Sequence, residues 1–531
     1  MAKLHLIGNA HIDPVWLWRW QEGFGEVLMT FRSVLERMKE FPELKFVSAC
    51  ALYYEWVERM DPEMFEEIRQ RVAEGRWEIV GGWMIQPDCN LPSGESFARH
   101  GLLSQRYFRE KFGVTAKTGY NVDSFGHNAS LPMILNQSGM TQYVFMRPNP
   151  EENGSLADLF LWESADGSRV VAHRIIRSYG LTEDRLEWLD RIKARCDRDK
   201  LPRMAFCGLG NHGGGPSIRV LEQIREKALP DTGFTTVGEY FATVDAEALP
   251  VHRSELQHHA IGCYSACSAV KRQNRQCEEN LILAEKLAVM AKKLTDTPYP
   301  HGELNKAWKT ALFNQFHDIM GGCSIESAYT DAAYGYGECM SITERVIYES
   351  MQRIGAKIDT LGEWNLPVYK DRRTKAIWSH ESIGSPVAVF NPHARSVRAP
   401  VEVNVCATRV TDERGQEVPF QLIRGEQTNR EDRYVTLFLA DLDPYGYAVY
   451  RVFCEEEPDA EPAKNSLHIS EHILENDRIR VELDEASGEL LRIYDKQKKQ
   501  IVMDRPCATV LFDETDCDTW AHGKSNLGAT V

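Results

Sequence analysis

Short apolar runs alternate with amphipathic stretches over the first half of the chain. The apolar runs predict strands at residues 4–8, 44–48, 77–82, 142–146 and 205–209. Apolar residues that recur near the helical period predict helices over 31–39 and 62–74. This strand–loop–helix repetition is typical of a parallel sheet covered by helices. Ligands of such sheets bind at the loops that follow the carboxyl ends of the strands.

The pattern changes twice further along the chain. Long helical stretches at 275–296, 304–314 and 341–361 predict a bundle of about three helices. Short β-branched or aromatic runs separated by turn residues then predict an antiparallel β region, with strands at 386–390, 401–405, 434–439, 448–452 and 479–483. An acidic, proline-containing stretch at 455–462 predicts a linker.

We therefore expect an α/β, then α, then β multidomain chain. Its predicted domains are an α/β domain at 1–260, a helical domain at 261–365, a β domain at 366–465 and a further β domain at 466–531. The hairpin predicted at 475–483 and 487–494 opens this last domain, and the sequence stops at Val531 before it could close. We expect this last domain to be incomplete.

Composition narrows the class of protein. The 531 residues suggest about three domains, and 43% hydrophobic with 26% charged residues excludes wholesale disorder. A net charge of -16 argues against a nucleic-acid binder or a partner of anionic membranes. The sequence has neither a spanning apolar run nor a signal-peptide core, and its 13 cysteines form no CxxC pair. We expect a cytoplasmic protein with free thiols.

His11 and Asp13 follow directly on the first predicted strand. In an extended segment they point to the same side, because side chains alternate with period two. Imidazole and carboxylate ligands suit zinc or a similar first-row cation. A buried histidine bonded to a turn aspartate is the alternative.

Two further clusters offer the same residue types. Asp123 ends a short strand-like run and could be a metal ligand, a nucleophile or a loop cap. Arg147 would lie at the same carboxyl-terminal edge of the sheet, where it would keep a neighbouring carboxylate ionised. His317 and Asp318 lie near the expected end of a helix, where a histidine could also simply complement the helix dipole. Two histidines and two aspartates at element ends form the donor set of a four-ligand cation site.

A glycine-rich loop at 208–216 contains Asn211 and His212. It lacks the Gly-Lys-Ser/Thr ending of a P-loop and the spacing of a dinucleotide loop. A plain turn is as consistent with this pattern as a ligand-binding role.

Taken together, these segments resemble a known family. Residues 11–16 (HIDPVW), 121–127 (NVDSFGH) and 316–321 (FHDIMG) are similar to the signature segments of family 38 glycoside hydrolases, the class II α-mannosidases. Segments 81–83, 87–90, 93–96 and 390–392 also resemble that family, in the same order. The resemblance runs from residue 3 to about residue 523 and covers nearly the whole chain.

The resemblance implies a seven-stranded α/β barrel, a three-helix bundle and the start of a C-terminal β-sandwich. It implies a zinc ion, or another divalent cation such as Co²⁺. The residues it implicates are His11, Asp13, Asp123 and His317 as metal ligands, Asp123 also as nucleophile, Arg147 beside it, Trp16 stacking under the sugar and Asp318 binding sugar hydroxyls. Family members usually run several hundred residues longer, which implies that the C-terminal β domain is cut short.

The implied activity is a retaining, metal-dependent α-mannosidase that releases terminal mannose from oligosaccharides or glycans. In much of the family an aspartate occupies the loop at 210–213, where this chain has Asn211 and His212. His212 is the predicted proton donor, since histidine can donate near neutral pH; Asp88 and Asp318 are the alternatives.

The alternative functions are a metal-dependent carbohydrate deacetylase and a non-catalytic sugar-binding subunit. The expected partners are a mannose-containing oligosaccharide and either a second copy of the chain or a segment that completes the β domain.

Overall fold

The computed structural model describes residues 3–360, 384–426, 434–454, 467–507 and 518–522. The chain divides into two compact units. The first contains the described residues up to Ala284, Pro300–Arg345 and the described residues 518–522, and the second contains the other described residues. All residues of the candidate site belong to the first unit.

A parallel sheet forms one half of the first unit. Its strand order is β3-β2-β1-β8, and β9 also pairs with β1. The strands are β1 (Leu4–Asn9), β2 (Phe46–Ser48), β3 (Trp77–Ile79), β8 (Arg203–Cys207) and β9 (Thr232–Phe234). Every residue of β1, β2 and β8 is buried, which explains why these strands appear in the sequence as continuous apolar runs.

A second sheet has the order β10-β6-β7-β5-β4, with β6 and β7 antiparallel and the other pairs parallel. Its strands are β4 (Thr118–Asn121), β5 (Gln142–Phe145), β6 (Leu159–Glu163), β7 (Arg169–Arg174) and β10 (Val251–His252). The Gly81 N–H donates to the Thr118 carbonyl at 2.8 Å, just beyond β3 and at the start of β4. Among the described residues of the first unit the strand pairings give two sheets, and the seven-stranded barrel stays a prediction.

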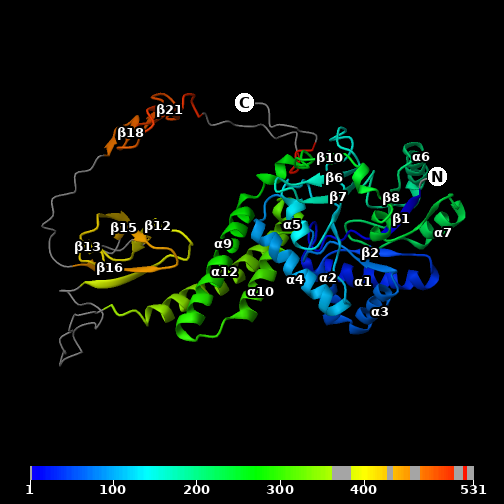
Figure 1. Ribbon diagram of the computed structural model, residues 1–531, viewed down its shortest axis with the longest axis horizontal. Helices are drawn as coiled ribbons and strands as arrows, with labels where there is room; N and C mark the ends of the chain where they lie inside the picture. Colours follow the sequence, from blue (N-terminus) through cyan, green and yellow to red (C-terminus); the bar gives the residue numbers. More distant parts are fainter. Residues whose placement is uncertain (1–2, 361–383, 427–433, 455–466, 508–517, 523–531) are drawn as a thin grey trace. The chain divides into compact units, whose positions relative to one another are not determined.

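Helices cover these sheets. Those of the first unit's α/β part are α1 (Trp20–Glu40), α2 (Ala51–Met60), α3 (Pro62–Ala73), α4 (Gly94–Phe112), α5 (Leu131–Gln137), α6 (Glu187–Asp199), α7 (Ile218–Lys227) and α8 (Val237–Phe241). Helices α1, α2 and α3 lie together on one side of β2 (Figure 1). α1 begins well before the predicted 31–39, and its buried face contains Val27, Phe31 and Val34. The Ser93 hydroxyl caps the start of α4, where it accepts from the Ser96 N–H.

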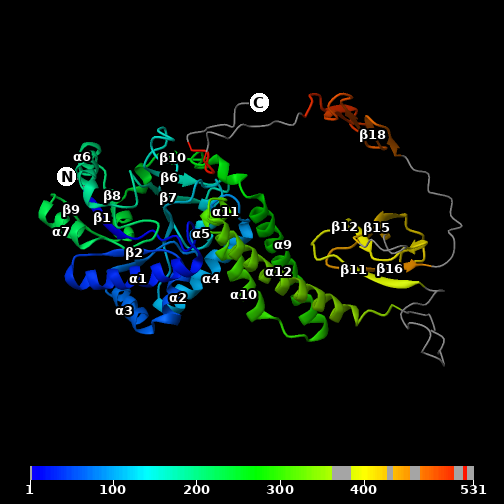
Figure 2. The same ribbon diagram turned by 180° about the vertical axis from the view of Figure 1, so that it is seen from behind.

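The helical region contains α9 (Ser268–Thr295), α10 (His301–Phe313), α11 (His317–Met320) and α12 (Glu326–Gly355), and Figure 2 shows α9, α10 and α12 side by side. Within the first unit the Tyr336 hydroxyl donates to the Asn314 carbonyl at 3.2 Å, and the Cys277 thiol donates to the Tyr336 carbonyl at 3.7 Å. The three-helix bundle as a defined architecture stays a prediction. The predicted helix at 341–361 starts much earlier in the structure, and Leu361 lies outside the described residues.

His317 and Asp318 lie in a helix that Gly321 terminates, as predicted. This helix is the short α11, which is separate from α10 because α10 ends at Phe313. Phe316 has an extended backbone and pairs with Pro87, while the Asp88 N–H donates to the Gln315 carbonyl at 2.9 Å. This pairing interrupts the helix and turns His317 towards the α/β part.

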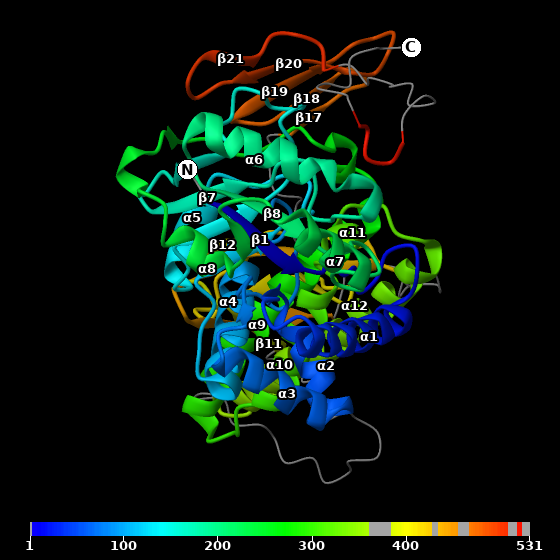
Figure 3. The same ribbon diagram turned by 90° about the vertical axis from the view of Figure 1, so that its right-hand side faces the viewer.

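The described strands of the second unit pair antiparallel. Two three-stranded sheets have the orders β11-β16-β13 and β12-β15-β14, and Figure 3 shows β17 to β21 lying next to each other in a third. The strands are β11 (Ser385–Phe390), β12 (Val397–Val403), β13 (Arg409–Thr411), β14 (Phe420–Arg424), β15 (Tyr434–Leu442), β16 (Tyr447–Phe453), β17 (His468–Ile469), β18 (Ile473–Glu475), β19 (Ile479–Leu483), β20 (Leu490–Asp495) and β21 (Gln500–Met503). Phe438 of β15 and Tyr450 of β16 belong to one apolar cluster, so the first two sheets share a core.

The predicted mixed α/β, multidomain organisation with a β C-terminal region is confirmed. The acidic linker predicted at 455–462 lies outside the described residues. In the described part of the chain the cysteines form no disulfide, and none of its helices has the length and hydropathy of a bilayer span.

Candidate metal centre and active site

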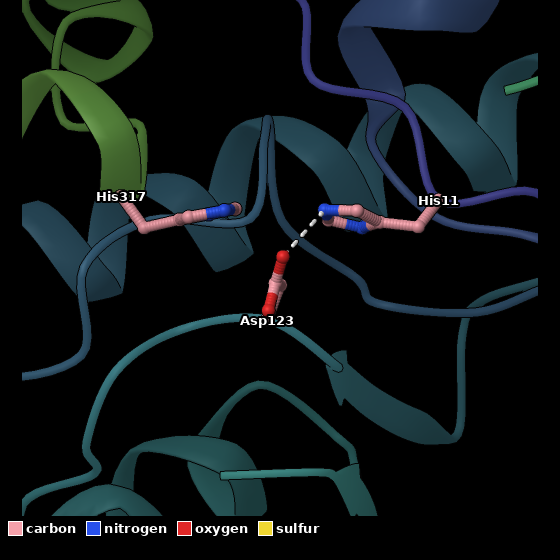
Figure 4. A group of neighbouring side chains, drawn as sticks. All are labelled: His11, Asp123 and His317. Carbon is pink, nitrogen blue, oxygen red and sulfur yellow. Dashed lines mark ion pairs between the residues drawn. The ribbon is translucent and has the colours of Figure 1, made fainter. Parts of the chain in front are cut away.

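Three side chains from distant parts of the sequence converge in the first unit. His11 follows β1, Asp123 follows β4 and His317 begins α11, and Figure 4 shows the three side chains pointing towards one another. One ligand atom from each lies within 4.8 Å of the others. The Nε2 atom of His11 lies 3.6 Å from Oδ2 of Asp123.

Asp13 joins the same cluster. Its Oδ1 atom lies 2.8 Å from Nε2 of His11 and 3.8 Å from Nε2 of His317. All of these side chains are buried, and Asp123, the most accessible, is 9% exposed. The site is therefore enclosed by protein and reaches solvent at the Asp123 side.

Local backbone contacts hold these ligands in place. The Asp13 N–H donates to the Asn211 carbonyl at 2.8 Å, and the Trp18 indole donates to the Asp13 carbonyl at 3.0 Å. The glycine-rich loop is thus fixed against the segment that contains His11. His317 Nδ1 lies 2.9 Å from the Gln86 carbonyl oxygen, which can only accept, so Nδ1 carries the proton and Nε2 keeps its lone pair.

The donor set fits a divalent cation. Within the described residues, Nε2 of His11, Nε2 of His317 and Oδ1 of Asp13 are buried and have no hydrogen-bond partner. Buried polar atoms are nearly always paired, so three unpaired atoms aimed at one point indicate a missing common partner. Two imidazoles and two carboxylates are the ligands that zinc and similar first-row cations prefer. Burial alone would lower the pKa of His11, but Asp13 and then Asp123 outweigh it and leave that pKa raised.

Asp123 is held on both oxygens. Arg147 Nε donates to Oδ1 at 2.5 Å, and the Tyr179 hydroxyl donates to Oδ2 at 3.0 Å. Burial alone would raise the pKa of Asp123, but the charges of Arg147, His11 and His317 outweigh it and hold that pKa below its usual value. The carboxylate is therefore ionised and fixed in direction, as a nucleophile requires.

Asp318 lies next to the same group of side chains. Its Oδ2 atom is 3.8 Å from Nε2 of His317, and the Cys323 thiol donates to Oδ1 at 3.1 Å. Burial, and next the charge of Asp13, raise the pKa of Asp318 well above its usual value. Trp16 lies close to Asp318, because its indole donates to the carbonyl of Cys323 at 3.1 Å.

His212 does not join the cluster. Its ring stacks on Trp18 at a centroid distance of 3.6 Å, its side chain is 52% exposed, and Nε2 lies 3.5 Å from a Glu22 carboxylate oxygen. Its backbone pairs with Ile12, so the loop remains beside the metal-ligand segment. Asp88, an alternative acid, uses Oδ1 to accept the N–H groups of Asn90 and Leu91, which is the role of a loop cap.

No sequence motif indicated Tyr179 as a residue of the site. It follows β7, a strand that the apolar pattern did not reveal, and Asn9 at the end of β1 donates to its carbonyl at 2.7 Å. Its hydroxyl also lies 3.2 Å from Oδ1 of Asn211. Tyr179 thus connects the candidate nucleophile to the glycine-rich loop. The position after the carboxyl end of a strand could have marked it, had β7 been recognised.

Comparison with known proteins places this geometry in a family. Residues 1–264 match the model of the glycosyl hydrolases family 38 N-terminal domain, and residues 258–354 match that of the alpha mannosidase middle domain. The chain belongs to glycoside hydrolase family 38. Both matched regions contribute to the cluster, since His11 and Asp123 come from the first and His317 from the second.

This family 38 chain is similar to several curated relatives. It is 30% identical over 378 residues to alpha-mannosidase G of Dictyostelium discoideum. The aligned region covers 68% of this chain and 34% of the relative. It is 30% identical over 350 residues to human alpha-mannosidase 2C1. The aligned region covers 64% of this chain and 34% of the relative. The family 38 chain thus spans about a third of the length of these relatives.

A solved structure of an alpha-mannosidase from Enterococcus faecalis V583 has a similar fold. Its TM-score is 0.75 at 19% identity, and the match covers 94% of this chain and 61% of that chain.

Proposed function

We propose that this family 38 chain is a retaining, metal-dependent α-mannosidase that removes terminal α-linked mannose from oligosaccharides or glycans. One observation carries the proposal: the ionised Asp123 carboxylate, fixed by Arg147 and Tyr179, lies within the His11–His317 group. The names of the curated relatives support mannose as the sugar.

The metal would be held by His11, Asp13, Asp123 and His317, and zinc or cobalt suits these ligands. When bound, such an ion supplies a positive charge that orients sugar hydroxyls and stabilises the transition state.

Asp123 would attack the anomeric carbon. A retaining glycosidase forms a covalent glycosyl-enzyme intermediate and then hydrolyses it with water. Arg147 prevents protonation of the nucleophile, and the Tyr179 hydroxyl fixes the direction of Oδ2. Positioning of this kind contributes because the reacting atoms must be held near attack geometry.

The proton donor in this proposal is His212. Its Nε2 atom lies 3.5 Å from a Glu22 carboxylate oxygen, and the Asp13–Asn211 hydrogen bond keeps its loop beside the site. Trp16 would stack under the sugar ring. Asp318, buried next to His317, would hydrogen-bond its hydroxyls.

The deacetylase and sugar-binding alternatives lack a supporting observation of this kind. A deacetylase needs water activated on the metal. The hydrogen bonds from Arg147 and Tyr179 to the two Asp123 oxygens instead support direct attack by that carboxylate. A non-catalytic subunit would have no need of an ionised, doubly anchored carboxylate.

The test is a panel of aryl glycosides followed by NMR of the first sugar released. The proposal predicts hydrolysis of the α-mannoside in preference to the α-glucoside and α-galactoside, with the α-anomer of mannose formed first. Formation of the β-anomer would contradict the retaining mechanism, and release of acetate from an acetylated sugar without mannoside hydrolysis would support the deacetylase.

A further inference from the structure

Arg147 has a second partner on the side away from Asp123. Its Nη1 atom lies 2.8 Å from Nε2 of His259, and Nδ1 of His259 lies 2.6 Å from Oε1 of Glu152. Four side chains therefore form one continuous chain of contacts that runs Glu152–His259–Arg147–Asp123.

The proton positions in this chain follow from chemistry. A guanidinium group can only donate, so Nε2 of His259 must accept from Arg147. Its Nδ1 atom then carries the ring proton and donates to the Glu152 carboxylate. Glu152 is fixed in turn, because its other oxygen accepts the Asn149 N–H at 2.8 Å.

The backbone of Arg147 is anchored separately. His127 Nε2 lies 2.9 Å from the Arg147 carbonyl oxygen, which can only accept, so His127 donates to it. The backbone of His127 exchanges two 2.8 Å hydrogen bonds with Leu256, three residues before His259. Hydrogen bonds through His127 therefore connect the main chain of Arg147 to the segment that contains His259.

His259 is shielded from water. Its side chain is 4% exposed, with the Phe125 ring 6.0 Å away and the His522 ring 5.1 Å away. The segment that contains His522 is attached to the same unit, because the Gly262 N–H donates to the Trp520 carbonyl at 3.1 Å. A hydrogen bond shielded in this way is stronger than an exposed one.

We infer that His259 is a positioning residue, supported by Glu152, that holds the Arg147 guanidinium in line with the Asp123 carboxylate. The inference rests on the proposed function, because it assigns His259 a part in the nucleophilic attack by Asp123. Neither His259 nor Glu152 would touch the sugar. Their effect would appear in the turnover step and not in substrate binding.

The test compares two substitutions of His259 in the full chain with metal bound. His259→Leu fills the space but removes the acceptor, and His259→Gln restores an acceptor near the same point. We expect His259→Leu to lower kcat on an aryl α-mannoside by about tenfold to a hundredfold with KM unchanged, since small displacements of catalytic groups cost up to that much. His259→Gln should recover most of the loss. The exposed neighbour His258, at a left-handed backbone position, gives the control His258→Asn, which should match wild type.

A double-mutant cycle separates positioning from a general structural role. If His259 acts through Arg147, His259→Leu should have almost no effect on kcat in an Arg147→Lys background. An equal loss in both backgrounds would overturn the inference, as would full activity of His259→Leu.

Nitrogen-15 NMR of the histidine rings in the wild-type chain gives a readout that does not depend on turnover. We expect His259, assigned by comparison with His259→Gln, to carry its proton on Nδ1. A proton on Nε2 would overturn the inference. Absence of mannoside hydrolysis by the wild-type chain would instead refute the proposed function, and the NMR result would still decide whether the Arg147–His259 contact exists.

Discussion

Nε2 of His11 lies 2.8 Å from Oδ1 of Asp13, yet neither atom has a hydrogen-bond partner within the described part of the chain. Two buried polar atoms at this distance need a cation or a proton between them. His317 adds a third unpaired atom, Nε2, at the same place. This arrangement is the physical basis for the proposed metal centre.

Asp123→Asn keeps the shape of the side chain and removes its charge. We expect kcat to fall at least about a thousandfold, in the range seen when a nucleophile is removed. Steady-state kinetics on an aryl α-mannoside, with circular dichroism as the check on folding, measures the effect. Activity above about a tenth of wild type would rule out Asp123 as nucleophile.

His317→Ala removes one imidazole from the cluster. We expect the purified variant to contain far less metal than wild type, because loss of one ligand from a closed site greatly weakens binding. Elemental analysis after dialysis measures the content. His212→Ala is the matched control: its ring stacks on Trp18 outside the cluster and should leave the metal content unchanged. Full occupancy in His317→Ala would place the fourth ligand elsewhere.

Tyr179→Phe removes the hydroxyl that donates to Asp123 and leaves the ring in place. A hydrogen bond to a charged group contributes about 1.5–3 kcal/mol, so we expect kcat/KM to fall by about tenfold to a hundredfold. Tyr120→Phe is the control, because that buried hydroxyl donates to Asn9 at 3.2 Å. An equal loss in both variants would mean that Tyr179 acts through general packing.

Three buried histidines make the fold sensitive to acid. Burial lowers the pKa of His100, His127 and His173 from 6.5 to about 3. Between these values the unfolded chain binds protons that the folded chain does not, so stability is full above pH 6.5 and falls as the pH drops towards 3. Each histidine contributes about 1.4 kcal/mol per pH unit in this window.

His100→Gln tests this contribution directly. Its unfolding free energy between pH 6.5 and 5 should depend less steeply on pH than that of wild type. Equal slopes would show that His100 titrates alike in the folded and unfolded chain.

The sequence predicted the elements whose signals are local. The strand at 4–8 was visible as an apolar run because β1 is buried throughout. The pairing of His11 with Asp13 was visible because the two residues are two positions apart in the sequence. The break in the helix before His317 was not visible in the sequence. It arises because Phe316 pairs with Pro87, more than two hundred residues earlier in the chain. Such long-range pairing has no signature in a window of neighbouring residues.

The supporting contacts of the site were equally hidden. Tyr179 and His259 lie in no sequence motif. Their roles depend on contacts with Asp123 and Arg147, which follow other strands of the fold. His212 shows the converse: the glycine-rich loop marked a special segment, but only the structure shows that its ring stacks on Trp18.

Metal dependence of turnover is tested by hydrolysis of an aryl α-mannoside by this 531-residue chain before chelation, after chelation, and after zinc or cobalt is returned. We expect turnover to be lost with the metal and regained with it, while the chain stays folded. Undiminished turnover by metal-free chain, or no turnover by the fully metal-loaded chain, would contradict this expectation.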